Sequence, residues 1–178
     1  MKEIGKQFEE GVEFEFCDNN NPSLKPHLSN DDFVAVVGRG EFLLLNDHGE
    51  FDKSNTVAIC LFDPDRNVHP EDTFKGYHDF IQMQFWDVEE PIGRIIPISD
   101  EQGKELFDFI SKNKDKRFLI HCEAGMSRSA GVAQAVETIK HFESSPYFFR
   151  TGFSAISEFG QKTGRYSPNL TVFDSIFK

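Results

Sequence analysis

Apolar and polar residues follow one another along the chain in short blocks that predict strands and helices. Apolar runs typical of buried strands occur at 33–37, 56–62, 80–85 and 118–120. Between the last two runs, Ser99 and Gln102 form a capping-box pair at the start of a helix. The apolar stripe of this helix follows at Leu106, Phe109 and Ile110. The order strand, helix, strand predicts parallel strands joined by a right-handed crossover.

Further helices are predicted in the second half of the chain. Small residues and spaced valines from about 128 to 142 indicate a helix that packs closely on a sheet. Ser-Pro pairs at 145–146 and 167–168 place proline at the favoured first helical position, ahead of apolar residues that face one way. Together with the strands, these helices predict an α/β fold with a central, mostly parallel sheet flanked by helices.

The first part of the chain has a weaker pattern. Alternating apolar and acidic residues at 12–16 suit a half-exposed strand. After the strand at 33–37, the triplet 38–40 (Gly-Arg-Gly) is interpreted as a hairpin turn and 42–45 as a second strand. No repeat, low-complexity segment or linker divides the chain, so residues 1–178 are expected to form a single domain.

The composition limits the class of partner. Twenty phenylalanines against one tryptophan and three tyrosines indicate a core filled largely by phenyl rings. A formal net charge of -11 argues against nucleic acid and anionic membranes as partners, because both bind basic surfaces. This charge is compatible with a phosphorylated substrate, because a local positive pocket can coexist with an acidic exterior.

The cysteines and the hydropathy bear on the compartment. Cys17, Cys60 and Cys122 are widely spaced, which favours reduced thiols over a disulfide framework or a zinc site. No apolar run is long enough to span a membrane, and the N-terminus lacks a signal-peptide core. The expectation is therefore a soluble cytoplasmic protein, with a monomer favoured.

The candidate chemistry is concentrated in the nine residues 121–129, His-Cys-Glu-Ala-Gly-Met-Ser-Arg-Ser. They follow an apolar strand and precede a helix, so the N–H groups of the turn and of the helix N-terminus can surround an anion. Arg128 can hold two oxygens of a phosphate in fork geometry. The same positive field favours the thiolate form of Cys122, which is the nucleophile. These features together indicate phosphoryl transfer to sulfur.

The pattern His-Cys-x-x-x-x-x-Arg-Ser resembles the signature of the cysteine-based protein tyrosine phosphatases, and His-Cys-x-Ala-Gly-x-Ser-Arg-Ser is similar to their dual-specificity branch. The resemblance covers roughly the second half of the chain and implies a dual-specificity phosphatase-like fold. It also implies that Ser129 donates a hydrogen bond to the sulfur and that His121 steadies the loop. The residues expected to bind phosphate mainly through backbone N–H groups are Glu123, Ala124, Gly125, Met126 and Ser127.

Phosphoryl transfer also needs a proton donor for the leaving oxygen, and a carboxylic acid suits this role. Asp87 follows the predicted strand at 80–85, and Trp86-Asp87 resembles the mobile acid loop of the family. Asp87 is therefore the expected general acid. Asp63 and Asp65 also follow a strand and stay as alternatives.

The expected function is hydrolysis of phosphomonoesters through a cysteinyl-phosphate intermediate, without a metal or an organic cofactor. His69, His78, His121 and Glu123 show no recognised metal-ligand spacing. Phosphotyrosine in protein or peptide is the expected substrate, with phosphoserine and phosphothreonine in addition. The loop lacks lysines and carries Glu123, which disfavours polyanionic lipid head groups and RNA ends. The alternative is a pseudophosphatase that binds phosphoprotein without turnover.

Overall fold

The computed structural model describes residues 34–48, 51–141 and 167–178. Four strands form one sheet in the order β1-β4-β2-β3, and every neighbouring pair is parallel. The strands are β1 (Val34–Gly38), β2 (Thr56–Phe62), β3 (Asp79–Gln84) and β4 (Arg117–Cys122). The predicted α/β class with a mostly parallel sheet is confirmed. Because all four strands are parallel, their carboxyl ends lie at one edge of the sheet.

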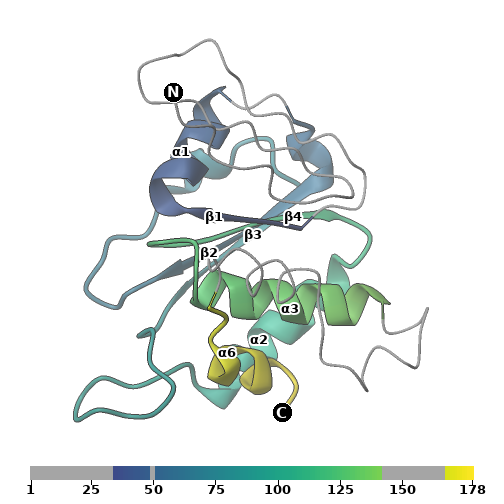
Figure 1. The fold of residues 1–178 in the computed structure, drawn as a ribbon. Coiled ribbons are helices and arrows are strands. Elements are labelled where there is room, and N and C mark those ends of the chain that lie inside the picture. Colours follow the sequence, from purple (N-terminus) through teal and green to yellow (C-terminus); the bar gives the residue numbers. More distant parts are fainter. Residues whose placement is uncertain (1–33, 49–50, 142–166) are drawn as a thin grey trace, which may run out of the picture.

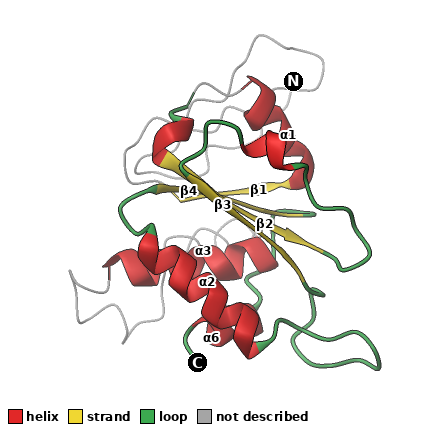
Figure 2. Ribbon diagram, turned by 180° about the vertical axis from the view of Figure 1, so that it is seen from behind, coloured by secondary structure: helices red, strands yellow, loops and turns green. Residues whose placement is uncertain are grey.

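Helices cover both faces of this sheet. Helix α1 (Arg39–His48) lies on one face, and three helices lie on the other, as Figures 1 and 2 show from opposite sides. These three are α2 (Asp100–Lys112), α3 (Arg128–His141) and α6 (Leu170–Ile176). Two short 3-10 turns, Lys53–Asn55 and Glu71–Phe74, flank β2 and β3.

The side chains of the strands alternate between two apolar cores. One core joins Val36, Ile59 and Ile120 of the sheet to the helices α2, α3 and α6. The other joins Val37 and Leu119 to aromatic and aliphatic side chains on the α1 face. Strands that are buried on both faces read as continuous apolar runs, which is why the sequence reveals β2 and β4 so clearly.

The strand–helix–strand prediction for 80–121 is correct about the direction of the strands. β3 and β4 run parallel in one sheet, and α2 lies between them along the chain. The two strands are not neighbours, however, because β2 lies between them and pairs with both. Strand β4 is an inner strand, paired with β1 on its other side. The residues that follow β4 therefore emerge near the middle of the carboxyl edge.

The prediction for 38–45 is wrong. Helix α1 begins at Arg39, directly after β1, in place of a hairpin turn and a second strand. Phe42 and Leu45 are buried at a three-residue spacing, whereas the two leucines between them are exposed. Residues 42–45 are all apolar, so the sequence does not show which of them face the core, and the helical spacing cannot be recognised. The Glu41 carboxylate accepts a hydrogen bond from the Gly38 N–H at 2.8 Å and closes the first turn.

The capping box before α2 is confirmed, since Ser99 and Gln102 exchange side-chain and backbone hydrogen bonds. Helix α3 starts at Arg128, as predicted. The last helix, α6, begins later than its Ser-Pro pair, because the side chain of Asn169 accepts the N–H of Val172 and acts as the N-cap. The strand predicted at 12–16 and the helix predicted from 145 lie outside the described residues. None of the described helices is long and apolar enough to cross a membrane.

Candidate active site

The loop between β4 and α3 joins Cys122, the last residue of its strand, to Arg128, the first residue of its helix. Gly125 in this loop has φ +69°, a conformation that favours glycine. A Cβ atom at Gly125 would lie 2.4 Å from the backbone of both Val37 and Gly38. The loop is therefore folded tightly against the end of β1, and only a residue without a side chain fits at this position.

Arg39, the first residue of α1, contacts the same loop. The Arg39 N–H donates to the Glu123 carbonyl at 3.2 Å, and the Arg39 guanidinium pairs with the Glu123 carboxylate at 3.1 Å. Arg39 also donates to the Asn67 carbonyl at 3.1 Å, which ties the β2–β3 loop to this cluster. Because Arg39 balances the charge of Glu123, Glu123 repels polyanionic substrates less than its sequence position alone indicates.

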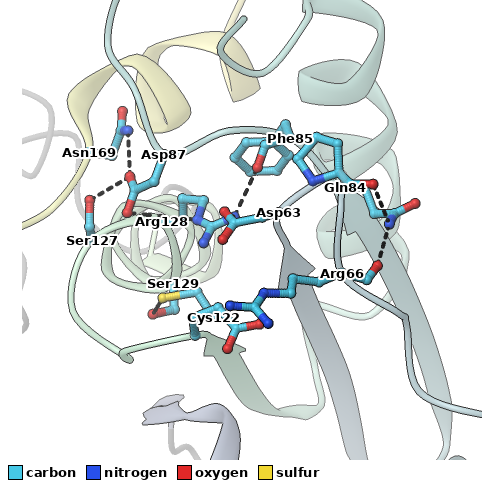
Figure 3. Close-up of polar contacts among 12 residues, drawn as sticks. Asp63, Arg66, Gln84, Phe85, Asp87, Cys122, Ser127, Arg128, Ser129 and Asn169 are labelled. Carbon is cyan, nitrogen blue, oxygen red and sulfur yellow. Dashed lines mark hydrogen bonds and ion pairs between the residues drawn. The ribbon is translucent and has the colours of Figure 1, made fainter. Parts of the chain in front are cut away.

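The Cys122 thiol is buried at the floor of the loop. Its Sγ lies 3.1 Å from Oγ of Ser129, in the first turn of α3 (Figure 3). A hydroxyl at this distance can donate to a sulfur anion and stabilise it, both before attack and when sulfur is the leaving group. The geometry agrees with the role that the family resemblance implies for Ser129.

Arg128 is almost fully buried, with 3% of its surface exposed. Its Nη1 donates to the Phe85 carbonyl at 2.9 Å and pairs with the Asp63 carboxylate at 2.9 Å (Figure 3). Its Nε is buried and finds no hydrogen-bond partner in the described part of the chain. Oδ2 of Asp87 lies 3.7 Å from this Nε, beyond hydrogen-bond distance. A buried guanidinium N–H without an acceptor is unfavourable, and a bound oxyanion would satisfy it.

Asp87 lies beside the loop and is held there by two donors. Its Oδ1 accepts from Oγ of Ser127 at 2.8 Å and from Nδ2 of Asn169 at 3.0 Å (Figure 3). These bonds orient the second oxygen, Oδ2, toward Arg128. Asn169 was not found from the sequence, because it is distant along the chain and belongs to no motif considered above. A signal that could have identified Asn169 is its position directly before an apolar helical run, which is typical of an N-cap.

The three candidate acids are now separated by position. Asp63 forms the ion pair with Arg128, Asp65 is exposed in the β2–β3 loop, and Asp87 contacts the loop of Cys122.

The segment before α6 also contacts the loop. Met126 is 41% exposed, and the carbonyl groups of Met126 and Ser127 accept hydrogen bonds from the N–H groups of Ser167 and Asn169. The segment before α6 therefore helps to hold both the loop and Asp87.

His121 lies beneath the loop and is fully buried. Its Nδ1 is 3.3 Å from the Cys122 carbonyl oxygen, and its Nε2 is 3.0 Å from Nε2 of His69. Burial, followed by the charge of His69, lowers the pKa of His121 to about 3. Cys60 joins these two histidines, so that one ligand atom from each lies within 4.8 Å of the others. No spacing rule predicted this group, because its members come from β2, the β2–β3 loop and β4.

Comparison with known proteins shows that the fold of this chain is similar to that of a solved tyrosine phosphatase. No family model and no curated protein sequence matches the chain. Among solved structures, OH1 from the Orf virus, a tyrosine phosphatase with triple substrate specificity, matches with TM-score 0.51 and 14% identity, over 90% of each chain. Tk-PTP in its active form matches with TM-score 0.46 and 18% identity, over 83% of this chain and 90% of that one. The human tyrosine phosphatase-like serine/threonine/tyrosine-interacting protein matches with TM-score 0.47 and 17% identity, over 79% and 83%.

Proposed function

We propose that this chain, which has the fold of the cysteine-based tyrosine phosphatases, hydrolyses phosphomonoesters on protein or peptide substrates. Phosphotyrosine is the main substrate, with phosphoserine and phosphothreonine in addition. The observation that carries the proposal is the buried Nε of Arg128, which has no acceptor among the described residues and lies at the end of the same short loop as the Cys122 thiol. A phosphate bound in this loop would supply the missing acceptor oxygen and present its phosphorus to the sulfur.

In the first step the Cys122 thiolate forms a bond to phosphorus while the bond to the leaving oxygen breaks. Arg128 and the N–H groups of residues 123–128 hold the equatorial oxygens, and Asp87 transfers a proton to the leaving oxygen. In the second step water attacks phosphorus and gives a proton to Asp87. The sulfur–phosphorus bond breaks, and the hydroxyl of Ser129 stabilises the departing thiolate.

Asp63 has a different role in this proposal. Its carboxylate and the Phe85 carbonyl both bind Nη1 of Arg128, which orients the guanidinium and leaves Nε for the phosphate. A catalytic thiol works in its reduced form, which favours the cytoplasm as compartment. No metal takes part in either step.

The direct test is release of phosphate from peptides carrying phosphotyrosine, phosphoserine or phosphothreonine, with a chelator present. Wild type should release phosphate, and Cys122→Ser should not. Arg128→Lys keeps the charge but loses the planar fork, so turnover should fall by about a hundredfold or more. The matched change Arg94→Lys, at an exposed position, should have no effect. A wild-type protein that binds these peptides without releasing phosphate would instead be a phosphoprotein-binding pseudophosphatase.

A further inference from the structure

Two buried histidines contact each other beneath the Cys122 loop. His121 belongs to β4 and His69 to the β2–β3 loop, and their Nε2 atoms are 3.0 Å apart. Both rings are buried, and the pair is enclosed by three phenylalanine rings. Phe42 stacks on His69 with centroids 5.2 Å apart, Phe62 contacts both imidazoles edge-on, and Phe74 contacts His69.

The hydrogen bonds determine which nitrogen carries each proton. Nδ1 of His121 faces the Cys122 carbonyl oxygen, which only accepts, so Nδ1 must carry the hydrogen. Nε2 of a neutral His121 is then an acceptor, and Nε2 of His69 must be the donor. Burial lowers the pKa of both histidines, which keeps them neutral at pH 7. The pair therefore has one satisfied arrangement of tautomers.

His69 is held in place to make this donation. Its N–H donates to Oε1 of Gln82 at 2.8 Å, and its carbonyl accepts from Nε2 of the same Gln82 at 3.0 Å. Gln82 belongs to β3, so a side chain of the sheet holds both the N–H and the carbonyl of His69. Phe42 of α1 stacks on the imidazole ring. These contacts with Gln82 and Phe42 come from outside the Cys122 loop.

We propose that His69 is a positioning residue for the nucleophile: it fixes the tautomer of His121, which in turn holds the backbone carbonyl of Cys122. The inference deepens the proposed phosphatase function and rests on it. Without the donor at 69, the acceptor nitrogen of His121 is buried among phenyl rings with no partner, which is unfavourable. If His121 then moves its proton to Nε2, its Nδ1 lone pair faces the carbonyl oxygen, and the backbone at Cys122 has to shift.

A metal ion bound by His69, His121 and Cys60 explains the same cluster less well. The two nitrogens are at hydrogen-bond distance, whereas two imidazole nitrogens on tetrahedral zinc lie roughly 3.3 Å apart. Among the described residues, no fourth His, Cys, Asp or Glu joins the cluster, and structural zinc sites have four ligands.

The test compares three variants of the full chain. His69→Phe fills the aromatic enclosure but removes the donor, and kcat/KM should fall about tenfold to a hundredfold, mainly through kcat. The pH dependence of Cys122 alkylation by iodoacetate should also shift. His69→Gln restores an N–H donor and should recover part of the activity. Cys60→Ala changes the third member of the cluster, whose thiol makes no side-chain hydrogen bond among the described residues, and should leave both readouts unchanged.

Nitrogen-15 NMR of the imidazoles provides a readout that does not depend on turnover. Wild-type His121 should show the Nδ1–H tautomer, and His69→Gln should preserve it. An Nε2–H tautomer in wild type, or an unchanged alkylation profile in a folded His69→Phe variant, would overturn the proposal. Stoichiometric zinc or copper in the protein as purified would also overturn it, in favour of a metal site. A wild-type protein with the expected tautomer but no phosphatase activity would refute the proposed function and leave the histidine pair intact.

Discussion

At the scale of single residues, three carboxylates that look alike in the sequence have different surroundings. Asp63 is paired with the buried Arg128, and Asp87 is held by Ser127 and Asn169 at the rim of the loop. Asp65 is exposed. A general acid must reach the leaving oxygen, and we propose Asp87 for this role because it lies beside the loop, with Asp63 orienting the guanidinium that it pairs with.

Replacement of these two carboxylates should give different kinetic signatures. Asp87→Asn should slow cleavage of phenyl phosphate about a hundredfold to ten-thousandfold, but an aryl phosphate with an acidic phenol much less, because that oxygen departs as an anion. Asp63→Asn should slow both substrates alike, because it disturbs the phosphate-binding arginine. Single-turnover kinetics make the comparison, since Asp87 also assists the second step. A leaving-group dependence seen in Asp63→Asn and not in Asp87→Asn would exchange the two roles.

At the scale of elements, the site depends on close contacts between the ends of strands and helices. The loop of Gly125 lies against Val37 and Gly38 at the end of β1, and α1 starts at the next residue. Gly103 of α2 lies against the backbone of Ser175 in α6, and Gly131 of α3 lies against Asn169 before α6. These glycines permit approaches that a single methyl group would prevent.

Gly125→Ala tests the contact that shapes the loop. The new Cβ would lie 2.4 Å from two backbone atoms, and its φ of +69° is strained for alanine. A displaced loop should reduce kcat by about a hundredfold. Gly93→Ala is the matched control for strain without contact, because Gly93 has φ +63° and no described atom within 4 Å of the added Cβ. It should keep wild-type kcat, and a wild-type kcat in Gly125→Ala as well would show that the contact with Val37 and Gly38 does not shape the loop.

Gly103→Ala tests the packing of α2 on α6. Its Cβ would lie 2.0 Å from the Ser175 carbonyl oxygen, so α6 has to move, at a cost of about 1–3 kcal/mol or more. In Gly40→Ala the added Cβ has no described atom within 4 Å and lies in the first turn of α1, so it should stabilise the protein by up to roughly 0.5–1 kcal/mol. Urea unfolding measures both changes. Destabilisation by Gly40→Ala would contradict the helix assigned to 39–48.

At the scale of the whole molecule, the buried histidines couple folding to pH. The pKa of His121 is about 3 in the folded state, mainly because of burial, against an ordinary value of 6.5. Between these two values the unfolded chain binds more protons than the folded one, so the free energy of unfolding rises with pH. The contribution is complete above pH 6.5 and declines as the pH falls toward 3. His69 acts in the same direction, because burial lowers its pKa also.

We therefore expect the free energy of unfolding to fall on acidification from pH 6.5 to 4.5, by up to about 1.4 kcal/mol per pH unit from His121, with His69 contributing in the same direction. Carboxylates with lowered pKa values, such as Asp79, contribute mainly below this range. Urea midpoints at several pH values measure the slope. His121→Phe should flatten it, and a wild-type protein with a flat profile over this range would show that the histidines are accessible to protons in the folded state.

Much of this protein is determined by local sequence. Continuous apolar runs specify the buried strands, the Ser99 and Gln102 pair starts α2, and the segment from His121 to Ser129 places a thiol and an arginine at the two ends of one loop. These features depend on residues close together in the chain, where side-chain period, capping and loop length act directly.

The tertiary structure alone decided the features that join distant segments. It placed β2 between β3 and β4, made a helix of 39–48, and gave Asp63 and Asp87 different contacts. It also brought His69 to His121 and Asn169 to Asp87, across 52 and 82 residues of chain. Sequence periodicity carries no information on such contacts. They arise because strands and helices packed on a common core bring their ends to one edge of the sheet, where polar groups that leave water must find partners.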